Sequence, residues 1–131
     1  MRNPDRLYKF YEELQKIHSS NFPDMDFPKF ILAFLDQYAR DPFFPEEDEI
    51  LMSIREYADG RKAEDWDGNL KYDPATYDKM RDIHMKAFPD WRFGQLLINF
   101  LGCVTCTRTQ LTEANFVKYL EQFAHGERPH D

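Results

Sequence analysis

The sequence has few cysteines, no long apolar run and no excess of basic residues, and each shortage excludes a class of protein. Its two cysteines, Cys103 and Cys106, are too few for the disulfide framework of a small secreted domain. No run approaches the roughly 20 apolar residues that a membrane-spanning helix needs. The first residues also lack the apolar stretch of a signal peptide. We therefore expect a cytoplasmic protein that does not associate with membranes.

The shortage of basic residues bears on nucleic acids. The net charge is −7, so the chain has no general attraction for a phosphate backbone. Residues 1–66 carry 15 acidic and 9 basic side chains, whereas residues 67–131 carry 9 and 8. The acidity is thus concentrated in the first half. We expect no direct binding of nucleic acid, and the acidic half is suited to a basic protein partner.

Apolar and aromatic residues, by contrast, are abundant. They make up 42% and 16% of the 131 residues, which excludes an intrinsically disordered chain. That length suffices for one compact domain or for two small modules that share an interface.

The chain contains an internal repeat. Residues 22–60 align without a gap on residues 88–126, at an offset of 66, and 9 of the 39 positions are identical. Most of the remaining apolar positions stay apolar. The best-matched stretches begin Phe22-Pro23-Asp24 and Phe88-Pro89-Asp90. This pattern indicates a module that was duplicated in tandem.

Apolar residues recur at helical spacing in six segments, and no segment has the period-two alternation of a strand. Helix starts are indicated at Asn3-Pro4, at Asp24 or Asp26, at Glu46, at Asp73-Pro74, after Asp90, and at Thr112. We expect the second helix to stop at Asp41-Pro42. The sequence thus predicts an all-α fold of six helices, arranged as two tandem, pseudo-symmetric three-helix modules. The expected boundaries are module A at 1–60, a linker at 61–72, module B at 73–126 and a frayed tail at 127–131.

Three clusters have the residue types of metal or catalytic sites. Cys103 and Cys106 have the CxxC spacing of redox pairs and half zinc sites, but they lie near a helix C-terminus, where the dipole disfavours a thiolate. We interpret them as ordinary, partly buried side chains, with a small zinc or redox protein as the alternative. Only His125 and His130 are conceivable further ligands.

The second cluster is the acidic turn that begins at Asp65. It resembles a calcium loop, but the sixth and twelfth positions hold Leu70 and Thr76 instead of Gly and Glu. The third is the pair His18 and His84, which occupy equivalent positions. Neither has a partner at catalytic spacing, so we expect boundary residues with one ring nitrogen hydrogen-bonded. We expect no cofactor and no enzymatic activity.

Two groups of residues are candidate partner-binding sites. Glu46, Glu47, Asp48 and Glu49 form an acidic run in the first turn of the third helix, where the helix dipole favours negative charge. The second copy has only one acid there, so capping alone does not require four. Trp91-Arg92 combines two residue types that dominate interface energetics, although Trp91 is equally suited to cover the core.

Three sequence blocks resemble those of small uncharacterised helical proteins of bacteria and their phages and prophages. The blocks are the opening Arg2–Arg6, the stretch from Pro89 to Asn99, and Asp41-Pro42-Phe43-Phe44 with the acidic run that follows. The first copy departs from the middle block at Asp26, Pro28 and Lys29, and the second copy lacks the Asp-Pro-Phe-Phe block. The resemblance implies a bacterial or phage origin and no particular activity.

These observations together predict a non-enzymatic protein-interaction module that acts as a monomer or homodimer. One alternative is a phage-type inhibitor that binds a basic surface of a host defence or nucleic-acid enzyme. True DNA mimics carry far denser negative charge than −7. The other alternative is the zinc or redox protein built on the cysteine pair.

Overall fold

The computed structural model describes residues 2–105 and 110–130 and confirms that the protein is all-α. No residue in these two ranges is in a strand. The helices are α1 (Arg6–Asn21), α2 (Phe27–Gln37), α3 (Glu47–Ala58), α4 (Pro74–Ala87), α5 (Phe93–Leu101) and α6 (Glu113–Ala124). Within the described chain, no helix is long and apolar enough to cross a bilayer.

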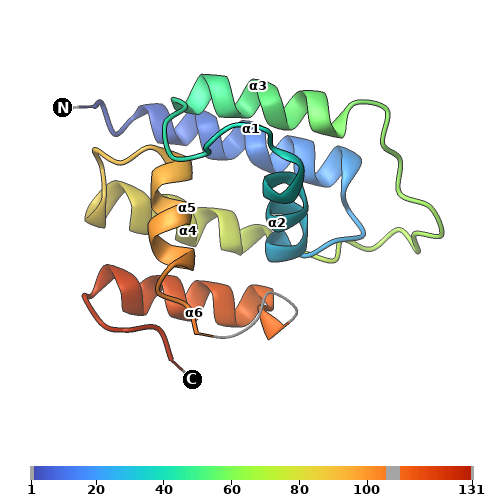
Figure 1. The fold of residues 1–131 in the computed structure, drawn as a ribbon. Helices are drawn as coiled ribbons and strands as arrows, with labels where there is room; N and C mark the ends of the chain where they lie inside the picture. Colours follow the sequence, from blue (N-terminus) through green and yellow to red (C-terminus); the bar gives the residue numbers. More distant parts are fainter. Residues whose placement is uncertain (1, 106–109, 131) are drawn as a thin grey trace.

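Four of the helices form a layer, and the other two lie across it (Figure 1). The order in the layer is α3, α1, α4, α6, and each helix contacts the next. The shorter helices α2 and α5 run roughly perpendicular to the layer. As a result α1 and α4, which come from different halves of the chain, lie side by side at the centre of the molecule.

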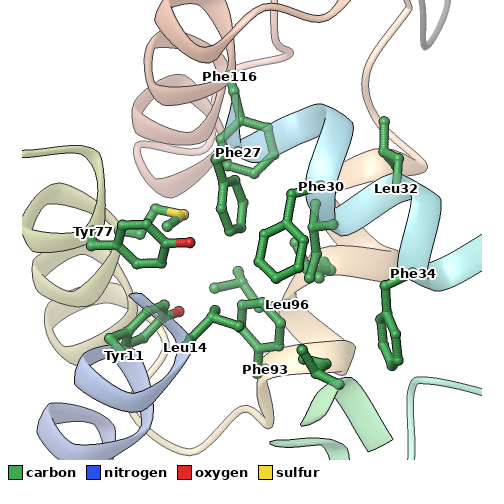
Figure 2. Packing of buried hydrophobic residues seen from close by; sticks show 14 of the residues in the cluster. Tyr11, Leu14, Phe27, Phe30, Leu32, Phe34, Tyr77, Phe93, Leu96 and Phe116 are labelled. Atoms are coloured by element: carbon green, nitrogen blue, oxygen red, sulfur yellow. The ribbon is translucent and has the colours of Figure 1, made fainter. Parts of the chain in front are cut away.

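A single buried cluster draws side chains from all six helices. Phe27 of α2 lies between Phe116 of α6 and Tyr77 of α4, and Phe30 lies beside Phe27, as Figure 2 shows. Phe93 of α5 packs on Phe10 and Tyr11 of α1. Each half of the chain therefore buries its apolar residues partly against the other half, which is the main source of stability for a domain of this size.

The predicted caps explain three of the six helix starts. Asp26, Asp73 and Thr112 accept hydrogen bonds from the backbone N–H groups of Lys29, Ala75 and Asn115. At the N-terminus, the Asn3 side chain accepts from Asp5 N at 3.0 Å, and regular helix begins two residues later than Pro4, at Arg6.

Two helices end earlier than the sequence predicts. Helix α2 ends at Gln37 instead of Asp41-Pro42, because Tyr38 adopts an extended backbone with ψ of 118°. Helix α5 ends at Leu101, although the apolar spacing of the helix continues to Val104. In both cases the apolar stripe continues past the helix, and periodicity alone does not reveal the end.

Residues of the expected linker and of the expected tail pack on or hydrogen-bond to the rest of the molecule. None of the residues 59–73 is helical, but Tyr72 is buried against His18, with ring centroids 3.9 Å apart. The Arg61 guanidinium donates to both carboxylate oxygens of Asp24, at 2.7 and 3.0 Å. In the tail, which we expected to be frayed, His130 N donates to Gln122 of α6 at 2.9 Å.

Candidate functional site

The first two acids of the run at Glu46–Glu49 form hydrogen bonds and ion pairs with other residues of the chain. Glu46 pairs with the Arg2 guanidinium, at 2.6 and 3.0 Å, which lowers the pKa of the Glu46 carboxyl. Glu47 is buried, and it accepts hydrogen bonds from Arg6 and from Phe93 N, the latter at 2.8 Å. Phe93 is the first residue of α5, so a carboxylate on α3 caps a helix in the other half of the chain.

The same arrangement occurs 66 residues later. Glu113, the first residue of α6, accepts from Phe27 N, the first residue of α2, at 2.9 Å, and from Asp73 N. Glu47 and Glu113 are identical positions of the repeat, and so are Phe27 and Phe93. Each half therefore caps the middle helix of the other.

The last two acids of the run face solvent. Asp48 accepts from Glu49 N at 2.9 Å, and Glu49 accepts from Glu46 N at 3.1 Å. These are local hydrogen bonds within the first turn, and both side chains are exposed. Of the four predicted acids, these two are available to a partner.

An open groove lies beside Asp48 and Glu49, between the C-terminal end of α2 and the exposed face of α3. We call it the α2–α3 groove, and its volume is about 710 Å³. Its floor is aromatic, since the buried Phe34 ring contacts both Tyr38 and Tyr57. Its residues are Phe34, Gln37, Tyr38, Ala39, Arg40, Asp48, Glu49, Met52, Ser53, Glu56 and Tyr57.

A second groove, of about 520 Å³, lies on the other side of α3, against α1. Asp48 and Met52 border both grooves, so Met52 stands on the ridge between them. Met52 is 61% exposed, so its apolar side chain is open to contact from a partner.

The charges in the second groove are mostly paired within the protein. Arg6 bonds to Glu47, Arg55 to Glu13 at 2.9 Å, and Glu46 to Arg2. The two grooves therefore differ: the α2–α3 groove has Asp48, Glu49 and Glu56 facing one cation, Arg40, whereas the other is internally balanced.

Trp91 and Arg92 are both held by neighbouring residues. The Trp91 ring stacks on Phe88 at 4.4 Å between centroids, and it also contacts Phe123. The Arg92 guanidinium donates to Phe43 O at 3.0 Å and lies over the Phe43 ring. Trp91 thus covers the end of the core, and Arg92 connects the start of α5 to the segment before α3.

The histidines differ from the sequence prediction, because both are fully buried with both ring nitrogens hydrogen-bonded. His84 Nε2 lies 2.6 Å from Trp91 O, and its Nδ1 lies 2.8 Å from the Tyr11 hydroxyl. A carbonyl can only accept, so Nε2 carries the proton and Nδ1 accepts from Tyr11.

His18 repeats this pattern, with Met25 O at 2.8 Å and the Tyr77 hydroxyl at 2.6 Å. Each Tyr–His bond joins α1 to α4. Burial lowers the pKa of both histidines to about 4. The two rings are therefore neutral structural groups without access to a substrate.

The remaining candidate sites gain little support from the structure. Cys103, which we expected to be partly buried, is exposed just after α5, and Cys106 lies outside the described residues. In the acidic turn, Asp67 accepts from Asn69 N and Lys71, and Asp65 has a positive φ of 55°. Among the described residues, no three His, Cys, Asp or Glu side chains are grouped to hold a metal ion.

Sequence reasoning missed two residues that organise this region, Tyr11 and Glu113. Both could have been found by comparing the two halves of the sequence, because Tyr11 corresponds to Tyr77 and Glu113 to Glu47 at the same offset of 66.

Comparison of the chain with known protein families, with curated proteins and with solved structures found no match.

Proposed function

We propose that this chain is a non-enzymatic protein-interaction module whose binding surface is the α2–α3 groove. The observation that supports it best is the combination, on one face, of an aromatic floor, an exposed Met52 and an acidic rim. Concave surfaces that pair apolar area with a few oriented polar groups are typical binding sites. The partner is a protein, and neither nucleic acid nor membrane suits an acidic rim.

The buried histidines argue for a scaffold and against acid–base chemistry. Their ring nitrogens are occupied by Tyr11, Tyr77 and backbone carbonyls, so they position helices. We place the protein in the cytoplasm of a bacterium or of a phage-infected cell, on the basis of the sequence blocks that it shares with small helical proteins from those sources.

We also propose that the six helices are two tandem three-helix modules related by pseudo-symmetry. In support, the Tyr–His pairs and the two capping glutamates recur at an offset of 66 residues. A duplicated chain supplies internally the contact that a single-module relative obtains by pairing. This favours a monomer, with a homodimer as the alternative.

A sharper version of this function is the inhibition of a host defence or nucleic-acid enzyme through a basic surface. The acidic rim favours it, because Asp48, Glu49 and Glu56 outnumber the one cation in the groove. The overall charge is too low for a DNA mimic that covers a whole binding channel.

Site-specific photo-crosslinking tests the proposed surface. A photoreactive amino acid is placed at Met52, and as a matched control at Lys118, the equivalent residue of α6. In a lysate of the source cells, we expect position 52 to crosslink one protein that unlabelled chain competes away, and position 118 to give none. Crosslinking of the same proteins from both positions would contradict the proposal. A nucleic-acid enzyme linked through its basic surface would support the inhibitor.

A further inference from the structure

The α2–α3 groove also has features that define its occupant, if it is the binding surface proposed above. We propose that it receives a basic amphipathic helix of a partner protein. In this arrangement apolar side chains of the helix contact Met52 and the aromatic floor, and its Lys or Arg side chains face Asp48, Glu49 and Glu56.

The dimensions of the groove suit about two turns of helix. Its α3 wall runs from Asp48 to Glu56, a rise of about 12 Å along the helix axis. Two turns present apolar residues at i, i+4 and i+7, which is how an amphipathic helix occupies a groove. The α3 wall is helical and has no free strand edge, so an extended peptide would find no backbone hydrogen bonds there.

The charges in the groove select a basic partner. Asp48, Glu49 and Glu56 are all exposed on α3, and Arg40 on the opposite wall is the one cation among the residues that line the groove. Charge complementarity of this kind selects partners and speeds their association. The Tyr38 and Tyr57 rings in the floor can in addition receive a Lys or Arg through a cation–π contact.

Met52 provides the apolar contact. A methionine side chain adapts to different partner shapes, and at 61% exposure this one gains apolar burial when it is covered. Met52 borders the second groove as well, so a helix seated in the α2–α3 groove contacts it from the α2 side.

The other half of the molecule provides a built-in contrast. The positions equivalent to Asp48, Glu49, Met52 and Glu56 are Ala114, Asn115, Lys118 and Gln122, none of them acidic. Ser53, half-buried in the groove, corresponds to Tyr119, which is buried in the core. The proposed site therefore exists once per chain, and binding should have a 1:1 stoichiometry.

The test uses three synthetic helical peptides of equal length. One has leucines at i, i+4 and i+7 with lysines on the other face, a second has glutamates in place of the lysines, and a third has the composition of the first in scrambled order. Affinity is measured by fluorescence anisotropy, and the site is mapped by backbone amide chemical shifts of the full-length protein. We expect saturable 1:1 binding of the first peptide only, with shifts confined to the end of α2 and to α3.

Two charge-matched variants separate the groove from general electrostatics. Asp48→Asn with Glu49→Gln and Glu56→Gln keeps the capping oxygens and removes three charges from the groove. Glu12→Gln with Glu64→Gln and Asp78→Asn removes three exposed charges elsewhere. We expect the first variant to weaken binding about tenfold or more and the second less than about threefold. Both should keep the wild-type helical spectrum.

Several outcomes would overturn the inference. They are equal weakening by the two variants, shifts spread over the whole surface, preference for the acidic or scrambled peptide, or occupation of the groove by a second copy of this chain. If position 52 still crosslinks a specific protein, but through an extended or acidic segment, the helix is wrong and the interaction module stands. If position 52 crosslinks nothing specific, both fail.

Discussion

Gly94, the second residue of α5, lies against the backbone of Pro42, in the segment that precedes α3. A Cβ atom added there would lie 1.7 Å from Pro42 O. Neither a carbonyl of the chain before α3 nor the helix start can move far without disturbing the core beneath them. The repeat places Pro28 at the equivalent position of α2, so this close approach belongs to one half only.

We predict that Gly94→Ala lowers the free energy of unfolding by about 2 kcal/mol or more, because the added methyl group forces α5 and Pro42 apart. The control is Gly102→Ala, where an added Cβ would lie 3.4 Å from Ile98 O and φ is −65°. That change should be close to neutral. Urea denaturation of both variants measures the difference, and equal effects would show that the contact is unimportant.

The two buried histidines give a second prediction, for the dependence of stability on pH. Their pKa falls from 6.5 to about 4 on folding, so between these values the unfolded chain binds more protons than the folded one. The two neutral histidines therefore contribute fully to the free energy of unfolding above pH 6.5, and this contribution decreases as the pH falls toward 4. We expect a loss of about 1–2 kcal/mol per histidine by about pH 5.

Urea denaturation at a series of pH values measures this loss. The carboxyls with lowered pKa, such as Asp24 and Glu46, act at lower pH, since their ordinary values are 3.8 and 4.5. His125 is exposed and serves as the control, so His125→Gln should keep the full dependence. An unfolding free energy that is constant between pH 7 and 5 would refute the assignment of neutral, buried rings.

At the scale of helices, the two capping glutamates determine how the elements are arranged. Glu47 pairs with Arg6 and accepts from the first N–H of α5, and Glu113 accepts from the first N–H of α2 and from Asp73 N. A helix start that is buried needs such a partner for its unpaired N–H groups. The middle helix of each half is therefore held in place by the last helix of the other half.

We predict that Glu47→Gln destabilises the protein by about 2–3 kcal/mol, because it leaves the half-buried Arg6 without a counter-charge. Glu46→Gln, one residue earlier, should cost less than about 1 kcal/mol, since the Arg2–Glu46 pair is largely exposed. Thermal unfolding of the two variants provides the comparison. If Glu46→Gln proves the more damaging change, the Arg6–Glu47 pair does not contribute more to stability than the exposed Arg2–Glu46 pair.

The sequence predicted the six helices, but it predicted the residues at which they end less well. Asp26, Asp73 and Thr112 cap their helices as predicted, because capping depends on residues only three positions apart. The end of α2 at Gln37 was missed, since Tyr38 keeps the apolar period while its backbone turns extended. Of the candidate surface, Asp48 and Glu49 were predicted from the acidic run, whereas Met52 and Glu56 required the fold.

For the whole molecule, the important feature is that the two halves share one core. Phe27 of the first half packs on Tyr77 and Phe116 of the second, and Phe93 of the second packs on Phe10 and Tyr11 of the first. The Tyr–His bonds connect α1 and α4 in both directions. Part of the apolar surface of each half is thus covered by its counterpart.

We predict that fragments 1–66 and 67–131 do not fold separately and that they recover the native helical content when mixed 1:1. Each fragment alone would leave a buried histidine without its tyrosine and the middle helix without its cap, with too small a core to compensate. Circular dichroism and sedimentation of the fragments and of their mixture give the measurement. Cooperative unfolding of either fragment by itself would mean that the halves are independent domains.

The sequence by itself determined that the chain is helical, where most helices start and that its two parts are related by an offset of 66 residues. These properties follow from short-range spacing and from comparison of one half with the other. Only the tertiary structure decided that Glu47 and Glu113 cap helices across the halves, that His18 and His84 are buried, and that Asp48, Glu49 and Met52 border an open groove. The physical reason is that capping, burial and concavity depend on which distant segments meet, and helical periodicity carries no information about that.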